Sequence, residues 1–196
     1  MSIQRGAGAT WPLRRFLLLR GRICGKVAEK IGGGIMEPVF SSAHIDFVQV
    51  SEALIPDYLE MVNDYEKVQR FIGGWTAPYT VEQEIKWVHR KLEEHAVVFS
   101  MLDRDSGAFI GNIELMDVAD GTGELGIAVT AKMQERGYGT EAVTALTRYG
   151  FQRLDLHRVF LRTNPANARA IHVYEKCGFR EYDRTEKHIC MERTRK

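Results

Sequence analysis

The chain has 196 residues, 44% of them hydrophobic, and a formal net charge of +1. This length is sufficient for one ordinary domain, and the charge gives no general electrostatic case for a nucleic acid or a membrane as partner. The three cysteines, Cys24, Cys177 and Cys190, are far apart, which suggests neither a disulfide framework nor a zinc site. We expect a cytoplasmic protein with a small-molecule or peptide partner.

Residues 1–35 differ in composition from the rest of the chain. Seven basic residues face a single acid, Glu29, and the apolar run Phe16–Leu19 is too short for a secretory signal. Three interpretations stay open: translation upstream of a true start at Met36, a basic organellar presequence, or an additional helix. The first is favoured, so we place the boundary of the folded domain at residues 36–196 and leave the role of residues 1–35 open.

Hydrophobic periodicity after Met36 predicts strands and helices in alternation. The helix at 80–94 has the clearest start, because Thr80 and Gln83 form a capping-box pair. Turn sequences at 105–107 and 120–123 separate three strands and predict an antiparallel meander. The predicted elements are a strand at 44–50, a helix at 56–65, a turn-rich piece at 71–78, a helix at 80–94, strands at 97–102, 109–117 and 124–130, a helix at 140–154, a strand at 158–163, a helix at 167–177, and strands at 179–183 and 187–191.

A glycine-rich turn, Gln134–Thr140, leads from the strand at 124–130 into the next helix. Gly137 and Gly139 lack Cβ atoms, so backbone N–H groups and the positive end of the helix dipole can converge on an anion. A meander that passes into alternating helices and strands predicts an α/β fold of the mixed α+β kind, with helices on both faces of one sheet. The turn is therefore predicted to bind the pyrophosphate of a nucleotide cofactor.

Two motifs resemble the GNAT superfamily of acetyl-CoA-dependent N-acetyltransferases. Residues 134–139 resemble its signature Q/R-x-x-G-x-G/A, and Asn167–Phe179 resembles the later helix, N-x-x-A-x-x-x-Y-x-K-x-G-F. The order of elements fits from Phe47 to Glu192, and nothing before Met36 has a counterpart. The resemblance is greatest to ribosomal-protein N-terminal acetyltransferases and related polyamine or antibiotic acetyltransferases, although the tail after Phe179 is short for the polyamine branch. It implies a central mixed, mostly antiparallel sheet flanked by helices.

The resemblance also implies a reaction and a set of site residues. Acetyl-CoA is the expected co-substrate and a primary amine the acceptor, first a protein N-terminus and second a small molecule, with the enzyme a monomer or homodimer. Tyr174 is the expected acid for the departing thiolate, and Asn167 shares its helical face. A backbone N–H at about Ala128 or Val129 is expected to stabilise the carbonyl oxygen. The residues expected to contact acetyl-CoA are Ile127, Ala128, Val129, Gln134, Arg136, Gly137, Tyr138, Gly139, Thr140, Asn167 and Lys176.

The amine must lose a proton before it attacks, and Glu124 is the candidate base. On a strand, Glu124 shares a face with Gly126 and Ala128, whose small side chains leave room for a ligand. A solvated surface carboxylate is the alternative interpretation of Glu124. Glu114 on the preceding strand is the reserve candidate for the base.

Other residue patterns carry weaker predictions. The six histidines lack the spacing of metal ligands, so no metal is expected. Trp75 and Tyr79 lie in a loop with glycine and proline and are expected to border the acceptor groove. Phe71 and Trp87 are expected to pack in the interior.

Rival functions fit the sequence less well. Residues 137–142 also satisfy the dinucleotide fingerprint G-x-G-x-x-G/A, but they do not open a first βαβ unit and no acid ends the next strand. A P-loop is excluded because its lysine is missing. A sensor that binds acyl-CoA without catalysis remains the alternative function, and nucleic-acid binding through residues 1–35 is a further, less favoured possibility.

Overall fold

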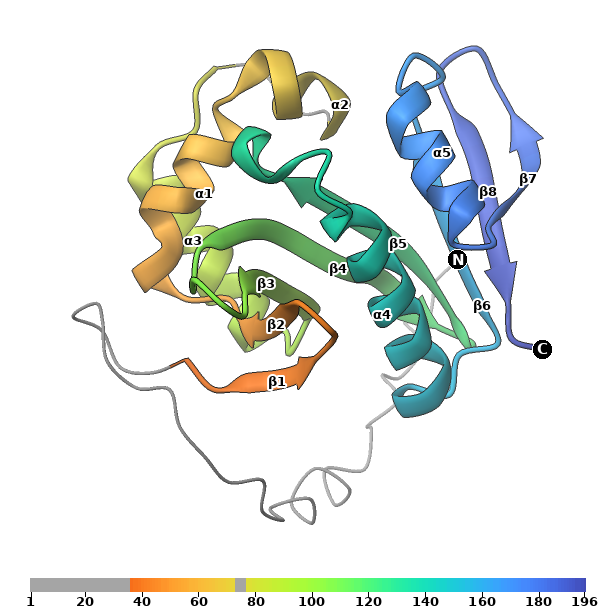
Figure 1. Ribbon diagram of the computed structural model, residues 1–196, viewed down its shortest axis with the longest axis horizontal. Coiled ribbons are helices and arrows are strands. Elements are labelled where there is room, and N and C mark those ends of the chain that lie inside the picture. Colours follow the sequence, from red (N-terminus) through yellow and green to blue (C-terminus); the bar gives the residue numbers. More distant parts are fainter. Residues whose placement is uncertain (1–35, 73–76) are drawn as a thin grey trace, which may run out of the picture. The chain divides into compact units, whose positions relative to one another are not determined.

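The computed structural model describes residues 36–72 and 77–196 (Figure 1). Predictions for residues 1–35 and for Trp75 lie outside the described residues. The described elements are β1 (Pro38–Ser41), β2 (Ile45–Gln49), the 3-10 turn η1 (Glu52–Leu54), α1 (Ile55–Val62), the π-helix η2 (Tyr65–Gln69), α2 (Arg70–Ile72), α3 (Val81–Glu93), β3 (Val97–Asp103), β4 (Phe109–Ala119), β5 (Thr122–Val129), the 3-10 turn η3 (Ala131–Met133), α4 (Tyr138–Arg153), β6 (Arg158–Thr163), α5 (Ala168–Lys176), β7 (Arg180–Arg184) and β8 (Ile189–Thr194).

The eight described strands form one sheet in the order β1-β2-β3-β4-β5-β6-β8-β7. Every neighbouring pair is antiparallel except β5 and β6, which run parallel. The predicted mixed, mostly antiparallel sheet with flanking helices is therefore confirmed. Within the described ranges, none of the helices combines the length and the apolar character needed to cross a membrane.

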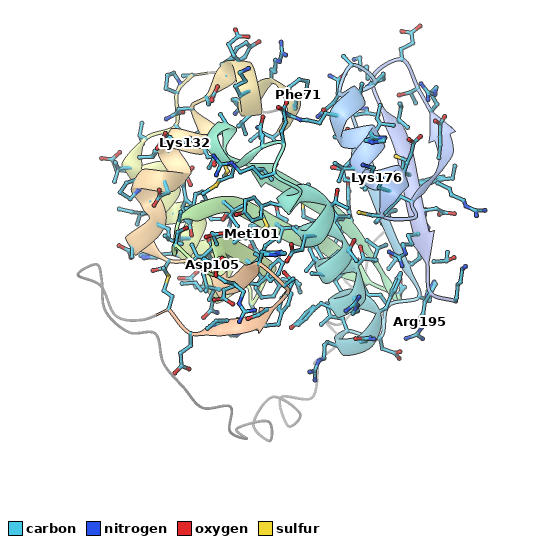
Figure 2. All side chains as sticks on the ribbon, viewed as in Figure 1. Phe71, Met101, Asp105, Lys132, Lys176 and Arg195 are labelled. Carbon is cyan, nitrogen blue, oxygen red and sulfur yellow. The ribbon has the colours of Figure 1, made fainter. Side chains whose placement is uncertain are left out.

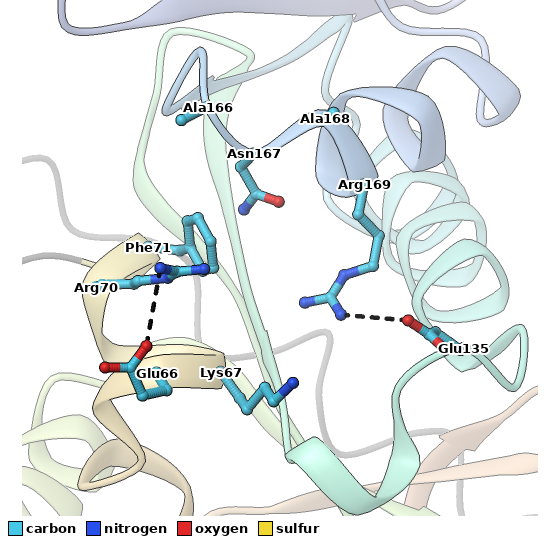
Figure 3. Close-up of a pocket in the computed structure, with 9 residues that line it drawn as sticks. All are labelled: Glu66, Lys67, Arg70, Phe71, Glu135, Ala166, Asn167, Ala168 and Arg169. Carbon is cyan, nitrogen blue, oxygen red and sulfur yellow. Dashed lines mark ion pairs between the residues drawn. The ribbon is translucent and has the colours of Figure 1, made fainter.

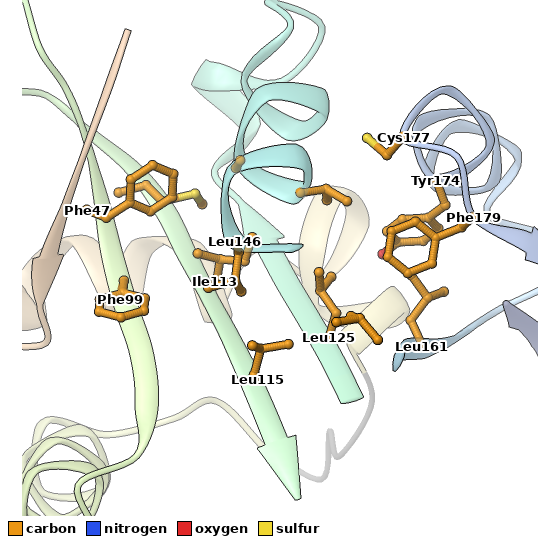
Figure 4. Packing of buried hydrophobic residues seen from close by; sticks show 14 of the residues in the cluster. Phe47, Phe99, Ile113, Leu115, Leu125, Leu146, Leu161, Tyr174, Cys177 and Phe179 are labelled. Carbon is orange, nitrogen blue, oxygen red and sulfur yellow. The ribbon is translucent and has the colours of Figure 1, made fainter. Parts of the chain in front are cut away.

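Alternating side chains give the sheet two buried faces, each covered by helices. On β2, Phe47 belongs to a core cluster with Leu146 of α4, whereas the next residue, Val48, belongs to a second cluster with Tyr58 of α1 and Val88 of α3. This alternation follows from the two-residue period of a strand. The sheet thus carries α4 and α5 on one face and α1 and α3 on the other (Figures 1 and 4).

Local signals in the sequence place most elements correctly. The capping box of α3 forms as predicted, with the Gln83 N–H donating to Thr80 Oγ1 and the Thr80 N–H donating to Gln83 Oε1 over 2.8 Å. α4 begins two residues earlier than predicted, at Tyr138, because Gly137 takes the N-cap position with a φ of 87°. Neither β1 nor the π-helix was predicted. β1 has only four residues, which is too short for a hydrophobic pattern to be detected.

The sheet divides between β5 and β6. Their parallel pairing covers only Thr122–Glu124 on β5 and Arg158–Phe160 on β6. Beyond Glu124, β5 continues beside β4 as far as Val129. Over the same length, β6 stays paired with β8 up to Thr163. The second half of β5 therefore has a free edge that faces a gap in the sheet.

Candidate active site

A cleft of about 920 Å³ lies at the gap between β5 and β6. Its walls include Gly139 and Tyr174 from the α4 and α5 face, and Glu84 and Trp87 from the α3 face. The cleft therefore passes through the sheet and connects its two faces. Its volume is in the range of small-molecule and cofactor sites, roughly 300–1,000 Å³.

Most of the predicted site residues meet in this cleft. Both predicted catalytic residues, Tyr174 and Glu124, line it. The predicted cofactor-binding residues that line it are Ile127, Ala128, Val129, Gln134, Gly137, Gly139, Thr140, Asn167 and Lys176. Arg136 and Tyr138 are not among the lining residues, so their predicted contacts with acetyl-CoA stay predictions.

The free edge of β5 supplies backbone donors to the cleft. The Thr130 N–H donates to the Ile110 carbonyl oxygen over 2.9 Å, toward β4. Because N–H groups alternate sides along a strand, Ala128 also faces β4, while Ile127 and Val129 face the gap. Of the two positions predicted for stabilising a carbonyl oxygen, Val129 therefore has the N–H on the cleft side.

The Gln134 side chain holds the glycine turn in place. Its Nε2 donates to the Val129 carbonyl oxygen over 2.9 Å and to the Lys67 carbonyl oxygen over 3.3 Å. Its Oε1 accepts from Arg169 Nη1 over 2.6 Å. Gln134 thus joins the end of β5 to η2 and α5, and its contribution to the site is to fix the turn that precedes α4.

Tyr138 anchors the start of α4 to the sheet. Its hydroxyl donates to Asp103 Oδ2 on β3 over 2.5 Å. Hydrogen bonds from Ser106 and Tyr138 lower the pKa of the Asp103 carboxyl to about 2, and the same carboxylate raises the pKa of Tyr138. This contact directs the Tyr138 side chain away from the cleft.

The glycine turn fits an anion at the helix start. Gly137 has positive φ, and a Cβ atom there would meet nothing within 4 Å. A Cβ on Gly139 would make only an ordinary contact with Val173, at 3.9 Å. The first turn of α4 therefore presents its N–H groups beside open space, which is the arrangement that binds phosphate groups.

Replacing Gly137 by alanine tests this turn. We expect the free energy of unfolding to fall by about 1–2 kcal/mol, because an L-residue is strained at positive φ. We also expect weaker acetyl-CoA binding by calorimetry. Gly107→Ala is the matched control, since Gly107 has a φ of 71°, has equally open surroundings and lies in a turn outside the cleft. Equal acetyl-CoA affinity in the two variants would contradict a role for the 137 turn.

Tyr174 lies on α5 with 7% of its surface exposed. Its ring packs against Phe179, with the centroids 6.1 Å apart (Figure 4). Burial raises the pKa of Tyr174 to about 12, and Cys177 adds a smaller effect. The phenol is therefore protonated at neutral pH and able to donate a proton or a hydrogen bond in the cleft.

Glu124 is held by a two-point ion pair with Arg162 of β6. Arg162 Nε donates to Oε1 over 2.9 Å and Nη2 donates to Oε2 over 3.0 Å. The Glu124 side chain is 10% exposed and that of Arg162 is 57% exposed. Because Phe160 is the last residue of β6 that pairs with β5, this ion pair bridges the strands where the gap begins. A proton moving to Glu124 would compete with the guanidinium for the same oxygens.

Glu114, the reserve candidate for the base, is also paired. Lys91 Nζ of α3 donates to Glu114 Oε2 over 2.6 Å. Gly126 lies opposite Glu114 on β5, and a Cβ there would approach Met116 Cε to 3.1 Å. The absence of a Cβ at Gly126 therefore permits close packing against Met116 and Glu114, and the room for a ligand beside Glu124 stays a prediction.

Glu84 was not predicted as a site residue. It lines the cleft from the first turn of α3 and is 7% exposed, and its carboxylate forms neither an ion pair nor a hydrogen bond with any residue of the described ranges. Burial raises the pKa of its carboxyl. The helix dipole favours such a carboxylate by about 0.3–1 kcal/mol, whereas taking an unpaired charge out of water costs several kcal/mol. The dipole alone does not account for this position.

The cleft continues toward a smaller pocket of about 380 Å³ near the start of α5. Figure 3 shows the side chains of Lys67 and Arg169 pointing from η2 and α5 toward the space between them. Asn167 caps α5, since its side chain accepts from the Ala170 N–H over 3.2 Å. Lys176 is exposed farther along α5 (Figure 2). These cations make the α5 side of the cleft suitable for an anionic ligand.

The cleft wall includes three of the aromatic residues considered in the sequence. Tyr79, which is predicted to border the acceptor groove, lines the cleft, and so do Phe71 and Trp87, which were expected to pack. Trp87 also packs edge-on against Tyr58, with the centroids 5.7 Å apart, so it serves both the core and the cleft wall. In the part of the chain that the structure describes, no group of three or more His, Cys, Asp or Glu residues is arranged to hold a metal ion.

Comparisons with known proteins agree with this geometry. Residues 44–180 match the family model of the acetyltransferase (GNAT) domain. The uncharacterized N-acetyltransferase YnaD of Bacillus subtilis is 30% identical over 103 residues, which is 52% of this chain and 61% of YnaD. The spermidine N(1)-acetyltransferase of Vibrio cholerae is 24% identical over 127 residues, 63% of this chain and 73% of that protein.

A solved structure shows the same fold. A Vibrio cholerae protein, provisionally described as a ribosomal-protein-serine acetyltransferase, superposes with a TM-score of 0.68 at 19% identity, covering 82% of this chain and all of the other. Because the family model covers more than half of the chain, the chain belongs to the GNAT acetyltransferase family and contains an N-acetyltransferase domain.

Proposed function

We propose that the protein transfers an acetyl group from acetyl-CoA to a primary amine by direct attack. The observation that carries this proposal is the cleft through the sheet, which has the glycine turn and α5 on one side and Glu84 and Trp87 on the other. Cofactor and acceptor would enter from opposite faces and meet at the free edge of β5. Acetyl-CoA would supply the thioester, which is the activated acyl group.

The residues of the chain have distinct roles in this proposal. Backbone N–H groups of Gly137, Gly139 and Thr140 hold the diphosphate at the positive end of α4. The Val129 N–H, on the cleft side of β5, donates to the oxygen that gains negative charge, an effect typically on the order of 10²–10³ in rate. Tyr174 donates its proton to the departing sulfur.

Glu124 stays the proposed proton acceptor, acting beside Arg162. We expect Glu124→Gln to lower kcat and to shift the pH profile of kcat/KM, because the amide keeps the shape of the side chain but loses its charge. The pH profile is measured with saturating acetyl-CoA and a varied amine. Glu181→Gln, an exposed carboxylate on β7, is the control. An unchanged profile in Glu124→Gln would assign the base to another group.

The acceptor is proposed to be a protein N-terminus, with a small-molecule amine second. The fold similarity to the protein provisionally described as a ribosomal-protein-serine acetyltransferase supports the first, and the sequence and fold similarity to the spermidine acetyltransferase of Vibrio cholerae supports the second. We place the enzyme in the cytoplasm as a monomer or homodimer, in keeping with the free thiols of Cys177 and Cys190.

Thiol release from acetyl-CoA tests the proposal. The full chain is assayed against N-terminal peptides, polyamines, amino acids and aminoglycosides, with and without residues 1–35. We expect amine-dependent release for one of these classes. Tight binding of acetyl-CoA without any amine-dependent release would instead favour a sensor that binds acyl-CoA.

A further inference from the structure

We propose that Glu84 pairs with the acceptor amine in its ammonium form as it enters the cleft, before that amine loses a proton to Glu124 and attacks, and that Glu84 selects acceptors that carry a single such charge on an apolar stem. This inference rests on the proposed acetyl transfer and names a contact on the acceptor side of the same cleft. It is carried by the charges, hydrogen bonds and burial around Glu84.

Glu84 is the carboxylate of the cleft that lacks a cation. Besides Glu84, three glutamates of the described ranges line the cleft. Each has a basic partner: Glu114 with Lys91 at 2.6 Å, Glu124 with Arg162 at 2.9 Å and Glu135 with Arg169 at 4.0 Å. A cationic acceptor would find Glu84 open to it, while the other three carboxylates are already engaged.

The Tyr58 phenol does not supply the missing partner. Burial is the main cause of the raised pKa of Tyr58, and the charge of Glu84 adds a smaller effect. The Ser100 hydroxyl donates to Asn112 Oδ1 over 2.9 Å, which leaves Tyr58 as the donor in its 2.6 Å bond to Ser100. Tyr58 also accepts from the Ser51 N–H over 3.2 Å. The proton of this phenol is therefore committed elsewhere.

The burial of Glu84 points to a ligand. Glu84 is 7% exposed and its carboxylate has no partner in the described ranges; this partial desolvation disfavours the charged form, so burial raises the pKa of its carboxyl. An ammonium ion entering the cleft would pair with this carboxylate and relieve that cost. An apolar residue would fill the same site without this cost if packing were its role.

The surroundings of Glu84 indicate the kind of amine. Apolar and aromatic side chains of Met61, Val62 and Trp87 line the same side of the cleft. An aromatic face attracts a cation, and aliphatic side chains accommodate a hydrocarbon stem. One unpaired carboxylate beside an apolar wall matches a singly charged primary amine better than a polyamine, which would need several.

The test uses the full chain and three probes: n-butylamine, spermidine and a tetrapeptide with a free N-terminus. In Glu84→Gln we expect the KM of the accepted amine to rise by about tenfold or more, with the KM of acetyl-CoA changed by less than about twofold. We expect n-butylamine or the tetrapeptide to be preferred over spermidine. Glu93→Gln, at an exposed position of the same helix without an ion pair, should match the wild type.

Thermal unfolding separates binding from a structural role. We expect Glu84→Gln and Glu84→Leu to melt at or above the wild-type temperature, because each removes a buried charge. An unchanged amine KM in Glu84→Gln, a lower melting temperature in both variants, or a preference for spermidine would overturn the inference. If the wild type releases no thiol with any amine, the proposed function fails. Calorimetric titration of n-butylamine into the CoA-loaded wild type and Glu84→Gln then still decides the role of Glu84.

Discussion

Replacing Tyr174 by phenylalanine should lower kcat on the order of 10²-fold or more, which is the usual contribution of a general acid. The substitution removes one oxygen from a ring that packs against Phe179, so the fold should be retained. Acetyl-CoA affinity, measured by calorimetry, should stay close to that of the wild type. The measurement is steady-state thiol release with saturating amine.

The pH dependence of kcat in the wild type provides a second test of the role of Tyr174. The pKa of Tyr174 is raised to about 12, so its neutral form persists below that pH and is lost only above it. Any decline in kcat between neutral pH and about pH 10 must then have another origin. Tyr149→Phe is the matched control, because Tyr149 is a partly buried phenol on α4 whose pKa is also raised by burial. Equal kcat values for Tyr174→Phe and Tyr149→Phe would remove Tyr174 from the mechanism.

Replacing Arg162 by methionine should lower the free energy of unfolding by about 2–3 kcal/mol. The substitution leaves the Glu124 carboxylate, whose side chain is 10% exposed, without the two donors that now hold it. Much of the Arg162 side chain is exposed, which keeps the expected loss below that of a fully buried pair. Urea unfolding of the purified variant measures the change.

A double-mutant cycle identifies the cause of that loss. In the double variant Arg162→Met, Glu124→Gln, the unpaired charge of Glu124 is removed. We therefore expect the double variant to regain most of the stability that Arg162→Met alone loses. Arg184→Met provides a control pair, because Arg184 binds Glu181 at 2.6 Å on the exposed strand β7 and should contribute little. Strictly additive losses in the Arg162 and Glu124 variants would show that the two residues are not energetically coupled.

The local parts of the site could be predicted from sequence. A glycine turn at a helix start depends on residues that are close together in the chain, and Gly137 takes the expected left-handed conformation. Asn167 and Tyr174 lie on one helix, so their spacing already places both on the cleft side of α5. The helix cap at Thr80 is equally local.

The partners of the charged residues could not be predicted in the same way. Arg162 is 38 positions from Glu124, and Lys91 is 23 positions from Glu114. Such pairs depend on strand register and on the face that a helix turns toward the sheet. One local pattern could have predicted the burial of Glu84, because it lies one turn before the buried Val88 on the same face of α3. That pattern is easily missed, because an acidic residue in the first turn of a helix is usually exposed and stabilised by the helix dipole.

The sequence by itself determined the order of the longer elements, the antiparallel meander and the glycine turn before α4, because these depend on periodicity and turn chemistry within short stretches. Only the tertiary structure decided that β5 and β6 separate after Glu124 and that the N–H of Val129, rather than that of Ala128, faces the gap. It also decided that Glu84 has no cationic partner, whereas Glu114 and Glu124 in the same cleft are paired. The physical reason is that each of these features depends on contacts between segments distant in the chain, whose register no local pattern specifies.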